Sequence, residues 1–404
     1  MIGRSMDFSL TQEQRQHVET VARFVRTMIL PGILEREKGH AFPEDIIAKA
    51  WELGIMNLSI PASLKGFEVD AVTSALIIKE LAYGDSGIAT SVMCNDLANV
   101  VIARHGTEAQ QGAFLQRFVA APLLASFCLT EPGAGSDNMA MTSFMKKTQD
   151  GRYLLNGAKC FITNASFASQ FTVFCKVGSP GGAFMACVVV PRGEGDREEV
   201  EVSPTRGRRI RLAAGGSVWT GKEEEKLGQR LSNTASVTFE DVVISPDQII
   251  GDRRRGFQYV MDVLDYARPM VAAIGVGLAR RALDLTLEYT KQRRQFNSRI
   301  CDLPVARDTL VKMWKKVETA ELALMKAAWL TDQGDPDRGR YASLAKNAAA
   351  EAALFCAAEG LHLHGGYGFM GEYEISKLAR DAHIIDIYEG VREVQDMIIG
   401  RELV

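Results

Sequence analysis

The sequence lacks most features that mark disulfide-stabilised or metal-binding proteins. Its seven cysteines are widely spread and form no C-x-x-C pair, so neither a disulfide framework nor a zinc site is expected. His362 and His364 stand two residues apart, the wrong spacing for one helical face, and no acidic cluster accompanies them. We therefore expect no metal site, and a reducing soluble compartment such as the bacterial cytoplasm.

Long apolar runs and an excess of positive charge are also missing. No stretch approaches about 18 consecutive apolar residues, and residues 1–8 contain no apolar segment, so neither a membrane span nor secretion is expected. Lys and Arg total 47 against 50 Asp and Glu, which leaves a formal net charge of -3. This balance provides no broad basic surface for nucleic acid.

The 404 residues, 47% of them hydrophobic, are enough to bury a large core and to divide into more than one lobe. In the first third, Thr11 and Gln14 have the spacing of a capping box, and a helical apolar period follows. Segments 46–53, 72–81 and 109–118 keep this period. The pattern predicts an N-terminal helical domain over 1–124.

From about Leu123 the sequence changes to short β-branched and aromatic runs separated by glycine-containing turns. These runs predict a mostly antiparallel β-domain over 125–250. Residues 192–226 are polar and longer than a hairpin requires, so we expect an inserted loop, which could equally be partly disordered. After Gly251 the helical period returns in 257–292, 305–333, 337–360 and from about Val391, which predicts a C-terminal helical bundle over 251–404.

Glycine-rich stretches offer several candidate phosphate-binding loops. Gly366, Gly368 and Gly371 spell G-x-G-x-x-G, but a helical pattern precedes them in place of a strand, so a Rossmann site is not indicated. Gly275 and Gly277 lie within a helical pattern and favour close helix packing. The loop "FCLTEPGAGSD", 127–137, follows a strand and combines backbone N–H groups with hydroxyls, which suits a flavin edge or a phosphate. Its alternative is a structural turn.

One carboxylate, Glu389, stands directly behind the apolar run "IIDIY" and before a glycine. Burial disfavours the charged form of a carboxylate. Glu389 is therefore either a surface residue at a helix start or an acid kept for its proton chemistry.

Seven stretches together resemble the acyl-CoA dehydrogenase family: "FCLTEPGAGSD", "LNGAKCFITNA", "KLGQRLSNTASVTFEDVVI", "DYARPMVAAIGVGLARRALD", "RRQF", "LHGGYGF" and "IYEG". They follow one another in the family's order and spacing, and the resemblance covers nearly the whole chain. It implies an α+β multidomain fold with an N-terminal helical domain, a central β-barrel-like domain and a C-terminal four-helix bundle. It also implies a homo-oligomer, usually a tetramer, and electron-transfer flavoprotein as the acceptor of electrons.

The resemblance implies FAD as the cofactor, placed between the β-domain and the bundle, with an adjoining protomer supplying part of the site. The residues carried over for FAD are Phe127, Leu129, Thr130, Gly135, Ser136, Phe161, Ile162, Thr163, Arg293, Gln295, Phe296, Gly365 and Gly366. Those carried over or suggested for the acyl-CoA substrate are Ser136, Asp265, Arg268, Tyr388, Gly390, Asp96 and Arg392.

The resemblance also implies the chemistry. Glu389 matches the catalytic base, which takes the α-proton of an acyl-CoA while a hydride leaves the β-carbon for flavin N5, giving a trans-2-enoyl-CoA. In another branch of the family the base stands at the position of Ala267, which cannot accept a proton. The chain therefore resembles the short-chain, medium-chain and glutaryl-CoA branch. A dry site should raise the pKa of Glu389 toward that of the C–H it deprotonates.

Two departures from the family pattern stand out. Val391 and Arg392 replace the small hydroxyl residues that usually follow the base and glycine, and Pro304 replaces a glutamine that contacts the neighbouring adenosine. Arg392 and the 192–226 segment suggest a specialised substrate, either an aromatic or alicyclic acyl group or a dicarboxylic one that an arginine could pair. Asp96 could shape that pocket or cap a helix.

Two other classes of function remain alternatives. An acyl-CoA oxidase would use the same base and pass electrons to oxygen, so it would produce peroxide. A non-catalytic acyl-CoA-binding protein would be colourless and would show no turnover.

Overall fold

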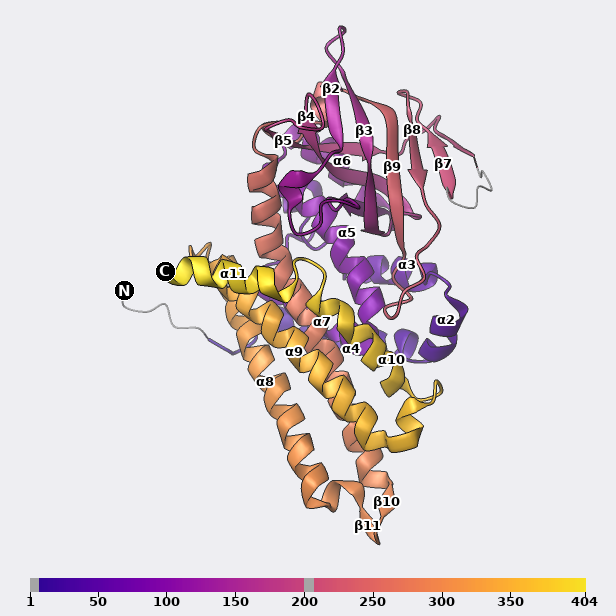
Figure 1. Cartoon of the computed structure of the whole chain (residues 1–404), viewed down its shortest axis with the longest axis vertical. Coiled ribbons are helices and arrows are strands. Elements are labelled where there is room, and N and C mark those ends of the chain that lie inside the picture. The colour runs from indigo at the N-terminus through magenta and orange to yellow at the C-terminus, as the bar shows by residue number, and fades with distance from the viewer. Residues whose placement is uncertain (1–6, 200–206) are drawn as a thin grey trace.

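The computed structural model describes residues 7–199 and 207–404. A helical N-terminal lobe, a curled sheet and a C-terminal helical bundle follow one another along the chain (Figure 1). The expected fold class is therefore confirmed. The N-terminal helices are α1 (Gln12–Phe24), α2 (Ile33–Gly39), α3 (Glu44–Glu52), α4 (Ala71–Gly84), α5 (Ser86–His105) and α6 (Glu108–Ala120).

The capping box predicted at Thr11 is present, because the Thr11 hydroxyl accepts from the Gln14 N–H and the Gln14 side chain accepts from the Thr11 N–H. Helix α5 is apolar and long enough to cross a membrane by length and composition. It is almost wholly buried within the protein, where it packs against β1 and α7, and this is the setting of a core helix.

The middle lobe is a nine-stranded sheet in the order β1-β4-β2-β3-β9-β8-β7-β6, with β5 paired to β4. Its strands are β1 (Leu124–Cys128), β2 (Phe144–Lys147), β3 (Tyr153–Thr163), β4 (Ala168–Val177), β5 (Met185–Pro191), β6 (Arg197–Glu199), β7 (Arg208–Arg211), β8 (Ser217–Thr220) and β9 (Thr234–Ile244). Side chains that include Phe171, Val188 and Phe239 form a core within the curl of this sheet.

The expectation of an inserted loop over 192–226 is wrong where the segment forms strands β6, β7 and β8. Strands β6, β7 and β8 extend the sheet beyond β9 as antiparallel neighbours. Ile210 of β7 and Val218 of β8 are buried in the core of the sheet. Burial of apolar side chains therefore stabilises both strands, although β7 is rich in charge. Residues 200–206 lie outside the described part.

The C-terminal lobe contains α7 (Gly256–Gln292), the β10–β11 hairpin (Arg294–Gln295 and Ser298–Arg299), α8 (Pro304–Asp332), α9 (Arg338–His364), α10 (Glu374–Asp381) and α11 (Arg392–Leu403). Helix α7 runs from the sheet to the β10–β11 tip of the bundle (Figure 1). Close packing at two α7 glycines is confirmed, because a Cβ on Gly275 would lie 3.0 Å from Ala349 and one on Gly277 would lie 2.3 Å from the Lys79 carbonyl oxygen. Helix α10 was not predicted.

Candidate active site

Glu389 lies in the turn between α10 and α11, and its backbone has the left-handed φ of 53°. Such a conformation is strained for a residue with a side chain, and it clusters at functional sites. The next residue, Gly390, has φ 98°, which explains the glycine at this position. The Gln395 amide donates to the carbonyl oxygens of Glu389 (3.2 Å) and Gly390 (2.9 Å), and Lys346 Nζ donates to that of Gly390 (2.6 Å). The turn is therefore held from α9 and α11.

Glu389 is half-buried, and burial raises the pKa of its carboxyl. The positive charges of Arg268 on α7 and Lys346 on α9 oppose this shift. The Glu389 N–H donates no hydrogen bond to any residue in the described part of the chain. The turn thus presents a carboxylate and a free backbone donor side by side, and both can face one substrate.

Residues of the other two lobes lie next to this turn. Cys94 on α5 is buried. Burial and the Glu389 charge together raise the pKa of its thiol to about 12, and a hydrogen bond with the Thr163 hydroxyl of β3 opposes the shift. Asn164, next to Thr163, donates to the Ser91 carbonyl oxygen of α5 at 2.9 Å. Base, α5 thiol and β3 hydroxyl therefore meet where the three lobes join.

Asp265 and Arg268 form an ion pair at 2.6 Å on α7. The Arg268 side chain is only 1% exposed, and its Nε has no hydrogen-bond partner in the part of the chain described. Because the Arg268 charge also acts on Glu389, this arginine lies close to the base. Its assignment to the coenzyme A arm, like that of Asp265, stays a prediction.

Several residues expected at the FAD site surround the loop after β1. Thr130 is half-buried, Gly135 and Ser136 are exposed, and Phe127 and Leu129 pack at the edge of the helical core. The loop is anchored by Glu131, whose carboxylate accepts from Lys159 Nζ (2.8 Å), Thr142 and Ser143. The buried Lys159 charge and these donors lower the pKa of Glu131 to about 2, against the opposing effect of burial. The loop is thereby fixed to β3.

At the end of β3, Phe161 is 69% exposed and Thr163 is half-buried. Ile162 between them is 2% exposed, and its side chain packs inside the core of the sheet. Because side chains alternate across a strand, only the backbone of Ile162 is available to a cofactor that lies over Phe161 and Thr163. The predicted role of Ile162 in FAD binding is therefore limited to its backbone.

The remaining FAD residues lie elsewhere. Arg293, Gln295 and Phe296 belong to the β10–β11 hairpin, at the opposite end of the bundle from the sheet (Figure 1). Phe296 is 87% exposed, and the Arg293 guanidinium lies 5.3 Å from the Tyr367 ring, next to the exposed Gly365 and Gly366. The predicted FAD residues of one chain therefore lie in two distant places.

The structure excludes one of the two interpretations of Asp96 and shows the partners of Arg392. Asp96 lies in the interior of α5, so it does not cap a helix; the N-cap of α5 is Asp85. Arg392 is paired with Asp386 at 3.0 Å and with Glu351 at 3.6 Å. Its guanidinium is thus already neutralised by two carboxylates, and its proposed pairing with a substrate carboxylate stays untested.

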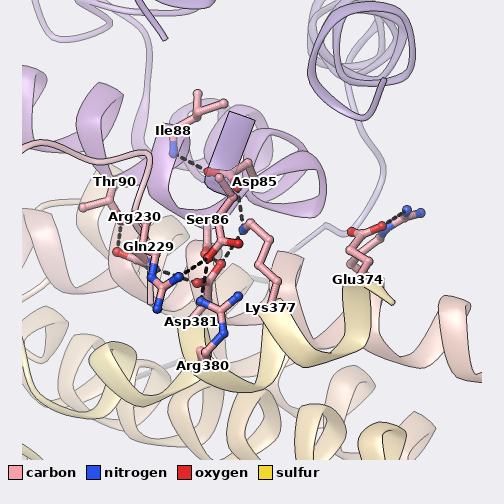
Figure 2. Close-up of polar contacts among 12 residues, drawn as sticks. Asp85, Ser86, Ile88, Thr90, Gln229, Arg230, Glu374, Lys377, Arg380 and Asp381 are labelled. Atoms are coloured by element: carbon pink, nitrogen blue, oxygen red, sulfur yellow. Dashed lines mark hydrogen bonds and ion pairs between the residues drawn. The ribbon is translucent and has the colours of Figure 1, made fainter. Parts of the chain in front are cut away.

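Sequence reasoning missed a buried charge cluster that joins the three lobes (Figure 2). Lys377 on α10 forms ion pairs with Asp85 at 2.6 Å and Asp381 at 2.5 Å, and all three side chains are nearly inaccessible. Asp381 also accepts from the Gln229 N–H of the β8–β9 loop at 2.6 Å, and Gln229 accepts from the Thr90 hydroxyl. The feature of the sequence that could have indicated this cluster is the (i, i+4) spacing of Lys377 and Asp381.

This cluster leads toward the base. The Thr90 hydroxyl on α5 lies 3.4 Å from the Tyr388 hydroxyl, and Tyr388 directly precedes Glu389. Burial raises the pKa of Tyr388, so its hydroxyl stays protonated at neutral pH. A continuous polar path therefore connects Lys377 with the residue next to Glu389.

The donor set near Glu389 fits a flavin. An uncovered Phe161 ring suits a planar ring system, and the hydroxyls of Thr130, Ser136 and Thr163 suit its polar edge and side chain. At the far tip of the bundle, Arg293 is exposed, and Gly365 and Gly366 after α9 have open space at their Cβ positions, as a pyrophosphate requires.

Comparison with known proteins decides the family. Family models for the N-terminal, middle and C-terminal domains of acyl-CoA dehydrogenases match residues 11–121, 126–242 and 254–404. The chain belongs to the acyl-CoA dehydrogenase family. Like other members, it is an FAD-dependent enzyme that dehydrogenates an acyl-CoA thioester.

Similar proteins cover the whole chain. The probable acyl-CoA dehydrogenase YngJ of Bacillus subtilis is 33% identical over 98% of this chain and 100% of its own length. The structure of butyryl-CoA dehydrogenase from Megasphaera elsdenii superposes with a TM-score of 0.89 at 31% identity, covering 98% of this chain and 100% of that one. A chain in a structure described as "Electron transferring flavoprotein of Acidaminococcus fermentans" has a TM-score of 0.89 at 29% identity, covering 99% of this chain and 100% of its own.

Proposed function

We propose that Glu389 is the base that removes the α-proton of the acyl-CoA. The observation that carries this proposal is its position: a half-buried carboxylate on a strained turn, close to Arg268 of α7 and to Cys94, which hydrogen-bonds Thr163 of β3. Burial raises its pKa and so makes it a stronger base toward a weakly acidic C–H. Ala267 offers no competing base.

Loss of the α-proton places charge on the thioester carbonyl oxygen, and this charge needs a donor where it develops. The free N–H of Glu389 is the donor that this chain supplies. Bound FAD supplies the acceptor for the hydride that leaves the β-carbon. Cys94, whose thiol stays protonated at neutral pH, closes the site against water from the α5 side.

A substitution tests the role of Glu389. Glu389→Gln should keep the yellow flavin and lose nearly all turnover of acyl-CoA, because the amide preserves shape but accepts no proton. Glu393→Gln is the matched control: Glu393 is exposed on α11, and its loss should leave turnover unchanged. Turnover retained by Glu389→Gln would contradict the assignment.

We propose that the FAD site is completed by a second copy of the chain in a homo-oligomer, for which the resemblance implies a tetramer. Support comes from the separation of Arg293, Gln295 and Phe296 from the sheet within one chain, and from the exposure of the hairpin and of Gly365 and Gly366. In this arrangement the hairpin of one copy holds the phosphates of the FAD whose ring lies at Phe161 of the other.

We propose electron-transfer flavoprotein as the electron acceptor and the cytoplasm as the compartment. The first is supported by similarity to a chain in a structure described by that flavoprotein's name. The second is supported by the Bacillus relative and by seven cysteines that are all free thiols. Peroxide formed in proportion to enoyl-CoA would contradict the first and favour an oxidase.

A further inference from the structure

A short loop, residues 387–391, carries the proposed base between the 3-10 segment Ala382–Asp386 and α11. Glu389 and Gly390 both have left-handed φ values there. The N–H groups of residues 389, 390 and 391 donate no hydrogen bond to any residue that the structure describes. On the proposed function, the Glu389 N–H must also stay free for the substrate. The strained backbone of this loop therefore has to be held by side chains.

An ion pair joins the two ends of this loop. Asp386 directly precedes the loop and Arg392 directly follows it, and both side chains are half-buried. Arg392 Nε donates to Asp386 Oδ1 at 3.0 Å. A contact between the two ends of a loop restricts the conformations that the residues between them can adopt. The Asp386–Arg392 bridge therefore limits how far the Glu389 carboxyl and N–H can move.

Arg392 also fixes the bridge to the helical bundle. Its guanidinium lies 3.6 Å from Glu351 on α9, and Glu351 pairs with Lys316 on α8 at 3.5 Å. The Asn347 amide of α9 donates to the Arg392 carbonyl oxygen at 3.4 Å. The start of α11 is thereby placed against the same helix from which Lys346 reaches the Gly390 carbonyl oxygen. The loop is thus held at its ends and at its centre from α9.

The charges of the bridge act on Lys346 as well. The Asp386 charge raises the pKa of Lys346 and the Arg392 charge lowers it, so the two effects oppose each other. Without Arg392, Asp386 would be an unpaired carboxylate that attracts the Lys346 ammonium away from the Gly390 carbonyl oxygen. Arg392 therefore closes the loop and also leaves Lys346 free to hold the residue that follows the base.

We propose that Arg392 is a positioning residue, whose bridge to Asp386 holds the Glu389 carboxyl and N–H in the arrangement that reacts with the thioester. Both partners of Arg392 are protein carboxylates, so the guanidinium acts on the loop and does not bind the substrate. Preorganised reacting groups accelerate a reaction because no ordering is left for the transition state. This inference rests on the proposed function, since it takes Glu389 as the base.

The test measures how fast straight-chain and dicarboxylic acyl-CoA thioesters bleach the flavin of the purified holoenzyme, at a pH above the acid limb of Glu389. The saturating rate reports the reaction, and its dependence on concentration gives the Kd of the thioester. Arg392→Gln should lower the saturating rate by about tenfold, because displacing a reacting group by about 1 Å can cost about 100-fold. The Kd of each thioester should change by less than about twofold, because the bridge does not contact the substrate.

Further variants show whether the bridge itself is responsible. Asp386→Asn should lower the rate as Arg392→Gln does, and the double variant should be no slower than either single variant, since both remove one interaction. Arg392→Lys keeps a charge for Asp386 and should recover part of the rate. If Arg392→Gln does not fold, Asp386→Asn and Arg392→Lys make the same comparison. Arg36→Gln is the matched control: Arg36 pairs with Asp45 at 2.8 Å between α2 and α3, and its loss should leave the rate unchanged.

The outcomes separate three explanations. In Arg392→Gln, a Kd that rises only for dicarboxylic thioesters, with the rate unchanged, would overturn the inference and assign Arg392 to a substrate carboxylate. Additive losses in the double variant, or an unchanged rate in both single variants, would overturn it while leaving the dehydrogenase function intact. A yellow wild-type protein that none of the thioesters bleaches would instead overturn the proposed function and the inference together.

Discussion

At the scale of single residues, the chemistry depends on how Glu389 is charged. Burial raises its pKa, and two cations, Arg268 and Lys346, restrain the rise. Lys346 is itself buried, which lowers its pKa to about 8, and it donates to the Gly390 carbonyl oxygen. Lys346 therefore acts both as an anchor of the turn and as a positive charge near the base.

Removing this charge should shift the pH dependence of the reaction. The base must be ionised, so kcat/KM falls as the pH drops through the raised pKa of Glu389. In Lys346→Met the pKa of Glu389 rises further, and the acid limb of the kcat/KM profile should move to higher pH. Lys222→Met, at an exposed position in the β8–β9 loop, is the control and should leave the profile in place. An acid limb that moves to lower pH would show that Lys346 does not favour the ionised base.

At the scale of elements, α10 joins the lobes through buried charge. Lys377 binds Asp85 before α5 and Asp381 at the end of α10, and Asp381 binds the backbone of the β8–β9 loop. Close backbone contact accompanies these bonds, because a Cβ on Gly228 would lie 2.5 Å from the Arg380 backbone. The cluster therefore fixes the approach of the chain to Tyr388 and Glu389.

Breaking the cluster from one side should be strongly destabilising. Lys377→Met leaves two buried carboxylates without their cation, and the free energy of unfolding should fall by about 3–5 kcal/mol, measured by denaturant titration of the holoenzyme. Lys312→Met is the matched control, because Lys312 pairs with Asp308 on the exposed face of α8, and little change is expected. Equal stability of the two variants would mean that the cluster contributes nothing net.

At the scale of the whole molecule, the residues proposed for the FAD site lie in two places that a single chain does not bring together. Glu389, Thr163 and the loop at Thr130 lie at the junction of the lobes, whereas Arg293 lies at the far tip of the bundle (Figure 1). If the hairpin of one copy serves the flavin of another, two different defects should complement each other.

Glu389→Gln and Arg293→Ala should each be nearly inactive as separate preparations, the first through loss of the base and the second through loss of FAD. Co-expressed with different affinity tags and purified as mixed oligomers, they should regain part of the activity. In such a mixture one FAD site combines an intact Glu389 with an intact Arg293 from the other copy. Mixed oligomers that stay inactive although they bind flavin would argue for sites built from a single chain.

Much of this protein follows from local sequence. Helical and strand periods placed the three lobes and the helices α7, α8 and α9 to within a few residues, because each long element buries one regular set of apolar side chains. The strands β6 to β8 escaped notice because they are only three or four residues long, and because β6 and β7 consist mainly of charged residues, with Ile210 the buried member of β7. Helix α10 is too short for a clear period.

The sequence by itself determined the family and the presence of an acid at position 389, since these depend on residue types in a fixed order. Tertiary structure decided what surrounds that acid. Arg268, Lys346 and Cys94 come from distant segments, and their effect on Glu389 exists only because packing brings them close and excludes water. The hydrogen bonds of buried Asp96 are likewise a product of folding, because Ser59, Asp96 and Tyr266 come from separate segments of the chain.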